Sequence, residues 1–225
     1  MFRPWSFLAA FGLVLLMTAS ASAQFRGMRF PPSLQNIFML RGDAVQKELK
    51  FTDEQKKTLS ELAAQLQSEA MEIISGLQDL SPEEQKEHMP ELMKMVSEKG
   101  KDIQEKVDKV LDKTQLARMK ELSLQSRGAA ALEDEEVIAA LKISDDQKVK
   151  LVAIRDEGSK KMEEAMQALR GGGGGGDAGE IRQKLMAMRK ELSDKAIEVL
   201  SPEQREQFEK MKGEKFTFPP QRGPF

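Results

Sequence analysis

An eight-residue phrase occurs twice in this chain, as LKFTDEQK at residues 49–56 and as LKISDDQK at residues 141–148, 92 positions later. The residues that follow each copy correspond as well, so the phrase belongs to a longer internal repeat. After the first copy, apolar residues recur every three or four positions, which predicts a helix with one apolar stripe. Five of the six stripe positions are apolar again in the second copy, and Gly158 is the exception. The six positions of the first copy are Leu59, Leu62, Leu66, Ala70, Ile73 and Leu77.

The repeat continues through a second helical pattern, in which residues 92–122 correspond to residues 181–211 at an offset of 89. The offset falls by three between the two patterns, so the connecting loop is shorter in the second unit. Each unit predicts a short lead-in helix, a long helix, a loop and a second long helix. We therefore expect an all-α fold of two tandem antiparallel helical hairpins, at residues 40–127 and 128–213, elongated and arranged as a pseudo-twofold cradle.

Two loops are expected to reverse the chain within the hairpins. The first lies at residues 78–90, and the second contains six consecutive glycines, Gly171 to Gly176. Each glycine costs about 1 kcal/mol relative to alanine inside a helix, so six in a row predict a flexible reversal. The alternative is a phosphate-binding loop. Such a loop needs a strand before the glycines and a Lys-Ser or Lys-Thr pair after them, and the sequence provides neither.

The repeated phrase predicts the start of a helix. In a capping box, the side chain of the first residue accepts a hydrogen bond from the amide three positions later, and the Gln there bonds back to the first amide. Acidic residues in the following turn interact favourably with the helix dipole. No His accompanies these Ser and Thr residues, so a catalytic role is not expected. The predicted pairs are Thr52 with Gln55, Asp112 with Gln115, Ser144 with Gln147 and Ser201 with Gln204.

The capping phrases resemble a known family. The stretches LKFTDEQ, VLDKTQ, LKISDDQ and VLSPEQ, which are expected to begin the four long helices, are similar to the motif of the LTxxQ family of periplasmic proteins, of the Spy, CpxP and ZraP type. The resemblance implies bent helical hairpins that pair into a thin cradle. It also implies an ATP-independent chaperone or stress adaptor that binds unfolded or partly folded proteins on the inner face of the cradle.

The chain departs from the family pattern in ways that change the expectation. Family members pair hairpins from two chains, whereas this chain carries both hairpins itself, so a monomeric pseudo-dimer is predicted. The His-rich segment of the zinc-associated branch is absent, and the chain is mildly acidic. A structural scaffold protein of the envelope is an alternative function.

Residue counts exclude several kinds of chemistry. The chain has no Cys and a single His, which removes disulfides, thiolate ligands, a Cys nucleophile and most acid–base chemistry. We therefore expect neither enzymatic activity nor a cofactor. Without residues 1–23, 34 Lys and Arg face 37 Asp and Glu, a net charge of −3, and no basic stripe with interleaved aromatic residues is present. Nucleic acid is therefore not an expected partner.

The N-terminal residues predict export. Arg3 precedes an apolar run over residues 7–17, and Ala-Ser-Ala stands before Gln24, which is the pattern of a signal peptide cleaved after Ala23. The alternative is an uncleaved anchor, but the run is short for a membrane span. No later segment is apolar enough to cross a bilayer. We therefore expect a periplasmic or otherwise exported protein without a transmembrane segment in its mature chain.

One stretch has the residue types of a metal site. His88, Met89, Met93 and Met95 lie in the sequence HMPELMKM, and imidazole and thioether groups suit Cu(I). The alternative is that these residues form part of a helix face, because Met commonly fills gaps in apolar packing. The second unit has no equivalent cluster. No metal is assigned on this basis, and a copper- or metal-responsive binding protein is a further alternative function.

Both ends of the predicted mature chain combine Phe, Arg, Gly and Pro-Pro. They form an N-terminal arm at residues 24–39 and a C-terminal tail at residues 214–225, and neither has a helical pattern. We expect both to be extended or disordered. They either dock on the hairpins, on a partner or on an envelope surface, or they are ordinary frayed termini.

Overall fold

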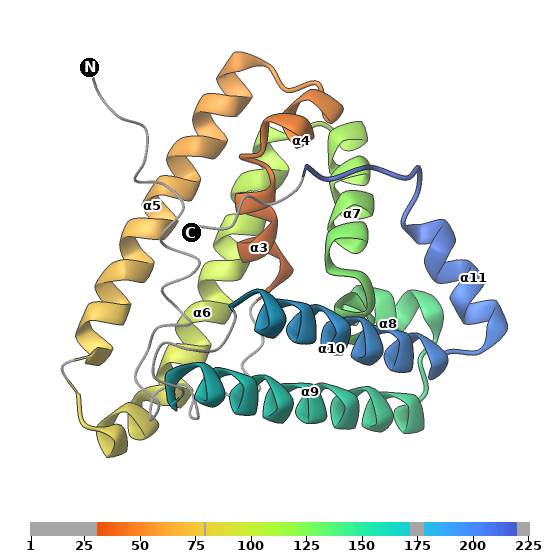
Figure 1. The fold of residues 1–225 in the computed structure, drawn as a ribbon. Coiled ribbons are helices and arrows are strands. Elements are labelled where there is room, and N and C mark those ends of the chain that lie inside the picture. The colour runs from red at the N-terminus through yellow and green to blue at the C-terminus, as the bar shows by residue number, and fades with distance from the viewer. Residues whose placement is uncertain (1–30, 79, 172–177, 220–225) are drawn as a thin grey trace. The chain divides into compact units, whose positions relative to one another are not determined.

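A computed structural model describes residues 31–78, 80–171 and 178–219 (Figure 1). These residues form helices and connecting loops without any strand among them, so the prediction of an all-α fold is confirmed. The chain divides into two compact units, of which the first comprises the residues up to Met119 together with those from Thr217 onward, and the second runs from Lys120 to Phe216. The predicted signal peptide, five of the six glycines and the last six residues of the tail lie outside the described residues.

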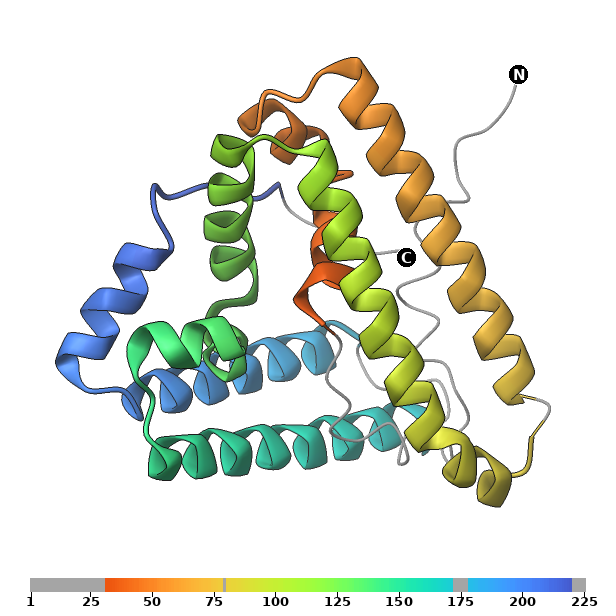
Figure 2. The same cartoon turned by 180° about the vertical axis from the view of Figure 1, so that it is seen from behind.

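The first unit is built around two long antiparallel helices. Its described helices are α3 (Pro32–Met39), α4 (Asp43–Glu48), α5 (Asp53–Gln78), α6 (Pro82–Val110) and the beginning of α7 (Lys113–Arg127). The two long helices, α5 and α6, pack side by side (Figures 1 and 2). They run in opposite directions, because Gln55 near the start of α5 donates to the carbonyl of Val110 at the end of α6. Farther along the pair, Glu69 of α5 and Lys99 of α6 form an ion pair of 2.8 Å.

The first loop is much shorter than the sequence predicts. The loop was expected over residues 78–90, but α6 begins at Pro82 and continues for 29 residues. Ser81 accepts a hydrogen bond from the amide of Glu84, and the Glu84 side chain accepts one from the amide of Ser81, which completes a capping box. Pro82 occupies the first helical position, where its missing N–H costs nothing. These features start a long helix, and Pro90 lies inside it.

The second long helix of the first unit ends earlier than expected. The apolar spacing continues from residue 92 to residue 122, yet α6 stops at Val110 and α7 begins at Lys113. Leu111 between them is extended, with φ −95° and ψ 143°, and Asp112 caps the new helix. The four capping phrases therefore begin α5, α7 and their counterparts in the second unit, α9 (Asp145–Gly171) and α11 (Pro202–Met211). They do not begin the second long helix of either unit, which corrects the expectation.

Part of the predicted N-terminal arm belongs to the packed first unit. The arm was expected to be extended or disordered over residues 24–39, but Pro32–Met39 forms the helix α3, which packs on α5 and α6. The hydroxyl of Ser33 donates to the carbonyl of Gly100 at 2.7 Å, and Ile37 is fully buried. A Pro-Pro pair is compatible with an extended chain, but it equally suits the start of a helix. Residues 24–30 of the arm lie outside the described residues.

The second unit repeats this arrangement, except that a 3₁₀ helix stands before its lead-in helix where the first unit has the α-helix α3. It contains the end of α7, a 3₁₀ helix η1 (Gly128–Glu133), α8 (Glu135–Leu141), α9, α10 (Ala178–Glu198) and α11. The long helices α9 and α10 run antiparallel, because Lys195 pairs with Glu157 at 3.1 Å and Lys161 with Glu191 at 3.5 Å. The sequence placed the boundary between the two repeats after residue 127. The structural division lies within α7, whose last turns pack into the second unit through Leu124.

Gly158 interrupts the apolar stripe for a steric reason. A Cβ atom at this position would lie 2.8 Å from Cδ1 of Leu192, so the glycine makes room for a leucine from the opposite helix. The rest of the stripe is most buried near the start of α5 and near the start of α9 (Asp145–Gly171). Leu59 is fully buried and Leu62 is 8% exposed, whereas Ala70 is exposed. Each unit therefore has its core at the end of the hairpin that carries the capping phrases.

The second core includes the fully buried Leu132 and Phe208, together with Leu151 and Leu200. Among the residues that the structure describes, no helix combines the length and the apolar composition needed to span a bilayer.

Candidate functional site

The first three residues of the repeated phrase form the turn that ends the preceding helix. In the first copy, Lys50 follows α4 with a left-handed φ of 52°. The amide of Phe51 donates to the carbonyl of Gln46 at 3.0 Å, and the amide of Lys50 donates to that of Lys47 at 3.1 Å. This pair of bonds is a Schellman motif, which satisfies the last carbonyls of a helix. The flanking Leu49 and Phe51 are both buried, so the turn is anchored on each side.

The second copy folds in the same way. Lys142 has the same φ of 52°, and the amide of Ile143 donates to the carbonyl of Ile138 at 3.0 Å. Leu141 and Ile143 are buried in the positions of Leu49 and Phe51. The lysine of the phrase is therefore the residue at which the chain turns from the lead-in helix toward the long helix.

The phrase then starts the next helix through a capping box. The Gln55 amide donates to Oγ1 of Thr52 at 3.2 Å, and the Thr52 amide donates to Oε1 of Gln55 at 3.1 Å. Lys56 pairs with Asp53 at 2.8 Å and lowers the pKa of that carboxyl group. The same reciprocal bonds occur in the other three predicted pairs, Asp112 with Gln115, Ser144 with Gln147 and Ser201 with Gln204.

The glutamines of the two capping boxes in the first unit also bind each other. Nε2 of Gln55 donates to Oε1 of Gln115 at 2.8 Å, and Nε2 of Gln115 donates back to Oε1 of Gln55 at 3.1 Å. The remaining donors reach main-chain carbonyls, from Gln55 to Val110 at 2.9 Å and from Gln115 to Leu49 at 3.0 Å. We call this pair the first glutamine clasp. It joins the end of α4, the start of α5, the end of α6 and the start of α7.

The second unit contains an equivalent clasp. Gln147 and Gln204 exchange amide hydrogen bonds of 2.7 and 3.1 Å. Gln147 also donates to the carbonyl of Val199 at 2.9 Å, and Gln204 donates to that of Leu141 at 3.0 Å. These carbonyls are the repeat equivalents of Val110 and Leu49. A shallow hollow that is broadly open to solvent lies over this second clasp.

The clasp explains why these four positions are Gln. Either Glu or Gln can complete a capping box, as Glu84 does at the start of α6. Only Gln can accept from the cap amide through Oε1 and also donate through Nε2. The sequence predicts the capping boxes from local spacing, but it does not predict that their glutamines meet across the unit. The signal was the recurrence of Gln, rather than Glu, at all four positions.

The first unit has an added ion pair beside its clasp. Arg118 of α7 contacts Glu48 of α4, with 2.6 Å between Nη2 and Oε1, and both side chains are largely buried. In the second unit the equivalent positions hold Gln207 and Ala140, and Nε2 of Gln207 donates to the carbonyl of Ala140 at 2.9 Å. The link between these two helices is retained although its chemistry differs.

The candidate metal residues do not converge on one point. His88, Met89, Met93 and Met95 all lie on α6. His88 and Met95 are exposed on one face, but seven residues place them roughly 10 Å apart along the helix axis. Met89 and Met93 are half-buried one turn apart on another face. Within the described ranges, no three or more His, Cys, Asp or Glu side chains are grouped to hold a metal ion.

Comparison of the chain with protein-family models, with curated proteins and with solved structures gives no match in any of the three.

Proposed function

We propose that this chain is an exported, non-enzymatic helical protein that acts as an ATP-independent chaperone or stress adaptor of the envelope by binding unfolded or partly folded proteins. The observation that supports this proposal most strongly is the pair of glutamine clasps. Each clasp is built from two of the stretches that resemble the LTxxQ motif, and each uses the Gln of the motif for a role that Glu cannot fill. In this chain the Gln of each stretch that resembles the motif therefore has a specific structural role.

The distribution of apolar surface also supports the proposal. Away from the clasps, the long helices carry apolar side chains that their own unit covers only in part, such as Ile73, Met93, Met162 and Leu185. Others are more exposed, at 44% for Met95 and 63% for Met186. Methionine is flexible and polarizable, which suits contact with varied apolar segments. We propose that clients bind along these hairpin surfaces.

An aggregation assay tests the function. Several unrelated client proteins are unfolded chemically and diluted into buffer with the mature protein at a near-stoichiometric ratio, and light scattering follows their aggregation. Suppression is expected without ATP, and adding ATP should change nothing. An equal concentration of an unrelated helical protein is the control. If none of the clients is protected, the chaperone proposal fails and the scaffold alternative is favoured.

A further inference from the structure

The two hairpins differ in what covers them. In the first unit, α3 packs on both α5 and α6 (Figures 1 and 2) and inserts the fully buried Ile37 and Leu40. Leu62 of α5 and Ile103 of α6 are nearly inaccessible, with exposures of 8% and 2%. The seam between the two long helices is therefore closed by a short helix from the same chain.

The second unit lacks the bulky side chains of this cover. At the repeat offset of 92, α3 corresponds to residues 124–131, and the Ile-Phe-Met of residues 37–39 becomes Ala-Ala-Ala at residues 129–131. Gly128, with φ +53°, stands at the position of Asn36 and ends α7, and a 3₁₀ helix follows. The cover of the second hairpin is therefore both smaller and differently folded.

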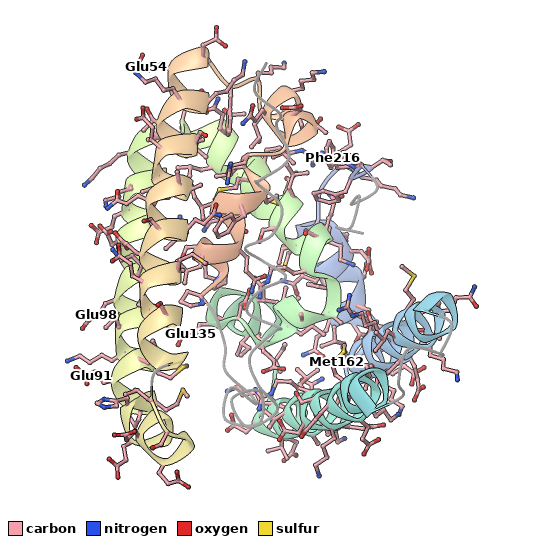
Figure 3. The ribbon with its side chains drawn as sticks, turned by 60° about the vertical axis from the view of Figure 1, so that its left-hand side comes forward. Glu54, Glu91, Glu98, Glu135, Met162 and Phe216 are labelled. Carbon is pink, nitrogen blue, oxygen red and sulfur yellow. The ribbon has the colours of Figure 1, made fainter. Side chains whose placement is uncertain are left out.

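The consequence is a partly uncovered seam. Ile154 and Leu192 are the counterparts of Leu62 and Ile103, but both are only half-buried. Met162, which is labelled on α9 in Figure 3, and Met188 of α10 continue this row and are also half-buried. We call these four residues the open seam. Below it the two cores are equally closed, since Leu132 is as fully buried as its counterpart Leu40.

We propose that the open seam of the second hairpin binds a short, uncharged amphipathic helix of a client protein, in the way that α3 occupies the first hairpin. This inference builds on the proposed function and names its binding face and the class of segment bound. The template is α3, whose buried residues Ser33, Asn36 and Ile37 are followed by Leu40 at helical spacing, and whose sequence has no charged residue. Apolar residues at this spacing lie on one face of a helix, and such a face is what an amphipathic helix places in an apolar groove.

One difference between the units refines the expected segment. Gly100 makes room for Pro31 at the start of α3, because a Cβ atom on Gly100 would lie 2.6 Å from the proline ring. The counterpart of Gly100 at offset 89 is Arg189, which is exposed. A segment bound in the open seam therefore cannot follow the first turn of α3 closely. We expect it to carry an uncharged polar residue there in place of proline.

A labelled peptide tests the proposal. The peptide SLQNIFML, residues 33–40, which leaves out the proline pair and has no charged side chain, is titrated with the full-length mature protein and followed by fluorescence anisotropy. Saturable binding is expected, and the peptide carrying Ile37→Asp should not bind. Leu192→Glu and Met162→Glu in the protein should each weaken binding about tenfold, because each places a charge in the apolar seat. Met186→Glu is the matched control, since Met186 is 63% exposed on the same helix as Leu192, and it should change binding less than about twofold.

A larger side chain in the cover of the second hairpin should also weaken peptide binding, because it occupies part of the open seam. Ala129→Ile restores part of the missing side chain of the cover and should weaken peptide binding without lowering the melting temperature. Circular dichroism melts verify that every variant is folded, and Met162→Glu is the variant least expected to unfold the hairpin.

The outcomes separate this inference from the proposed function. If clients are protected but the peptide does not bind, or binds equally to all variants, the seam is not the binding face although the chaperone function stands. If neither occurs, the proposed function also fails. If light scattering shows a concentration-dependent dimer that the peptide dissociates, the occupant is α3 of a second copy rather than a client.

Discussion

Glutamine at the third position of a helix offers an amide donor that glutamate lacks. In this chain that donor determines how two distant chain segments meet, because Gln55 and Gln115 each cap their own helix and bind each other. Their remaining donors satisfy the carbonyls of Leu49 and Val110 near the ends of two other helices. Such carbonyls otherwise need water or a capping group. A single residue type therefore meets the hydrogen-bonding needs of four helix ends.

A swap between Gln and Glu tests this residue-level role. Gln115→Glu keeps the acceptor for the Asp112 amide but removes both donors and directs a carboxylate at the carbonyl of Leu49. Because Gln115 is only 8% exposed, we expect a loss of about 1–3 kcal/mol in the free energy of unfolding. Glu84→Gln is the control, since that capping box is exposed and Gln can also complete it, and it should leave the free energy of unfolding nearly unchanged. Urea unfolding followed by circular dichroism measures both, and equal effects would contradict the clasp.

At the scale of elements, close packing between helices depends on glycine at two positions. Gly158 lies under Leu192, and Gly100 lies under Pro31. Gly76 is also helical, but apart from its chain neighbours and the backbone of its own helix no atom lies within 4 Å of the place where its Cβ would be. The three glycines thus separate the effect of helix propensity from that of steric contact.

Replacing each glycine by alanine should give three different results. Alanine favours the helix by up to about 1 kcal/mol at each site. Gly76→Ala should therefore raise the melting temperature. Gly158→Ala should change it little, because the end of the Leu192 side chain can move away. Gly100→Ala should lower it, since the contact at 2.6 Å is with a rigid proline ring. Thermal melts that rank the three in another order would show that the helices are not packed as described.

The antiparallel pair α9 and α10 is also joined by a charged lattice. Hydrogen bonds from Lys161 and, to a smaller extent, from Lys195 lower the pKa of Glu157. The hydrogen bond from Lys195 lowers the pKa of Glu191. A carboxyl group with a lowered pKa in the folded state stabilises the fold above its unfolded pKa. That contribution disappears as the pH falls through its folded value. The lattice is exposed, so its contribution is small and sensitive to salt.

The pH dependence follows from this sign. The double variant Glu157→Gln, Glu191→Gln should melt at a lower temperature than the unmodified protein at pH 7. The difference should shrink as the pH falls from about 5 to about 3, because the unmodified carboxylates become protonated there. Thermal melts at low salt measure it. A difference that stays constant across this range would mean that the lattice does not contribute.

The elements differ in how well the sequence predicts them. The spacing of Leu59, Leu62 and Leu66 and the cap at Thr52 identify α5 almost to the residue. The break before Asp112 is hidden, because apolar spacing continues across it and the extended Leu111 is itself buried. α3 is missed because its short sequence has few repeats of the helical period. The clasps could not be predicted because they depend on contacts between residues about 60 positions apart, such as Gln55 and Gln115.

At the scale of the whole molecule, the chain consists of two units that share one design and differ in their covers. Each has a lead-in helix, a Schellman turn, two long antiparallel helices and a clasped closing helix. The outward surface of the long helices is strongly charged, as Glu91 and Glu98 on α6 illustrate (Figure 3). Because both hairpin repeats are already present in one chain, we expect no second copy to be needed.

Multi-angle light scattering on the mature protein tests that expectation. A mass that corresponds to one chain, independent of concentration, is expected at neutral pH. A stable dimer would mean that each chain still needs a partner to cover its apolar surface, as the two-chain family pattern implies.

Double-mutant cycles test most directly whether the repeated phrase forms two independent and equivalent glutamine clasps. Gln55→Met and Gln115→Met, which retain side-chain size without hydrogen-bonding amides, are combined with each other and, separately, with Gln204→Met. Within the first clasp the effects on unfolding should be strongly non-additive, with a coupling of about 0.5–3 kcal/mol. Between Gln55 and Gln204 of different clasps they should add. Additive effects of Gln55→Met and Gln115→Met would contradict the clasp, and coupling between Gln55 and Gln204 would contradict the independence of the two units.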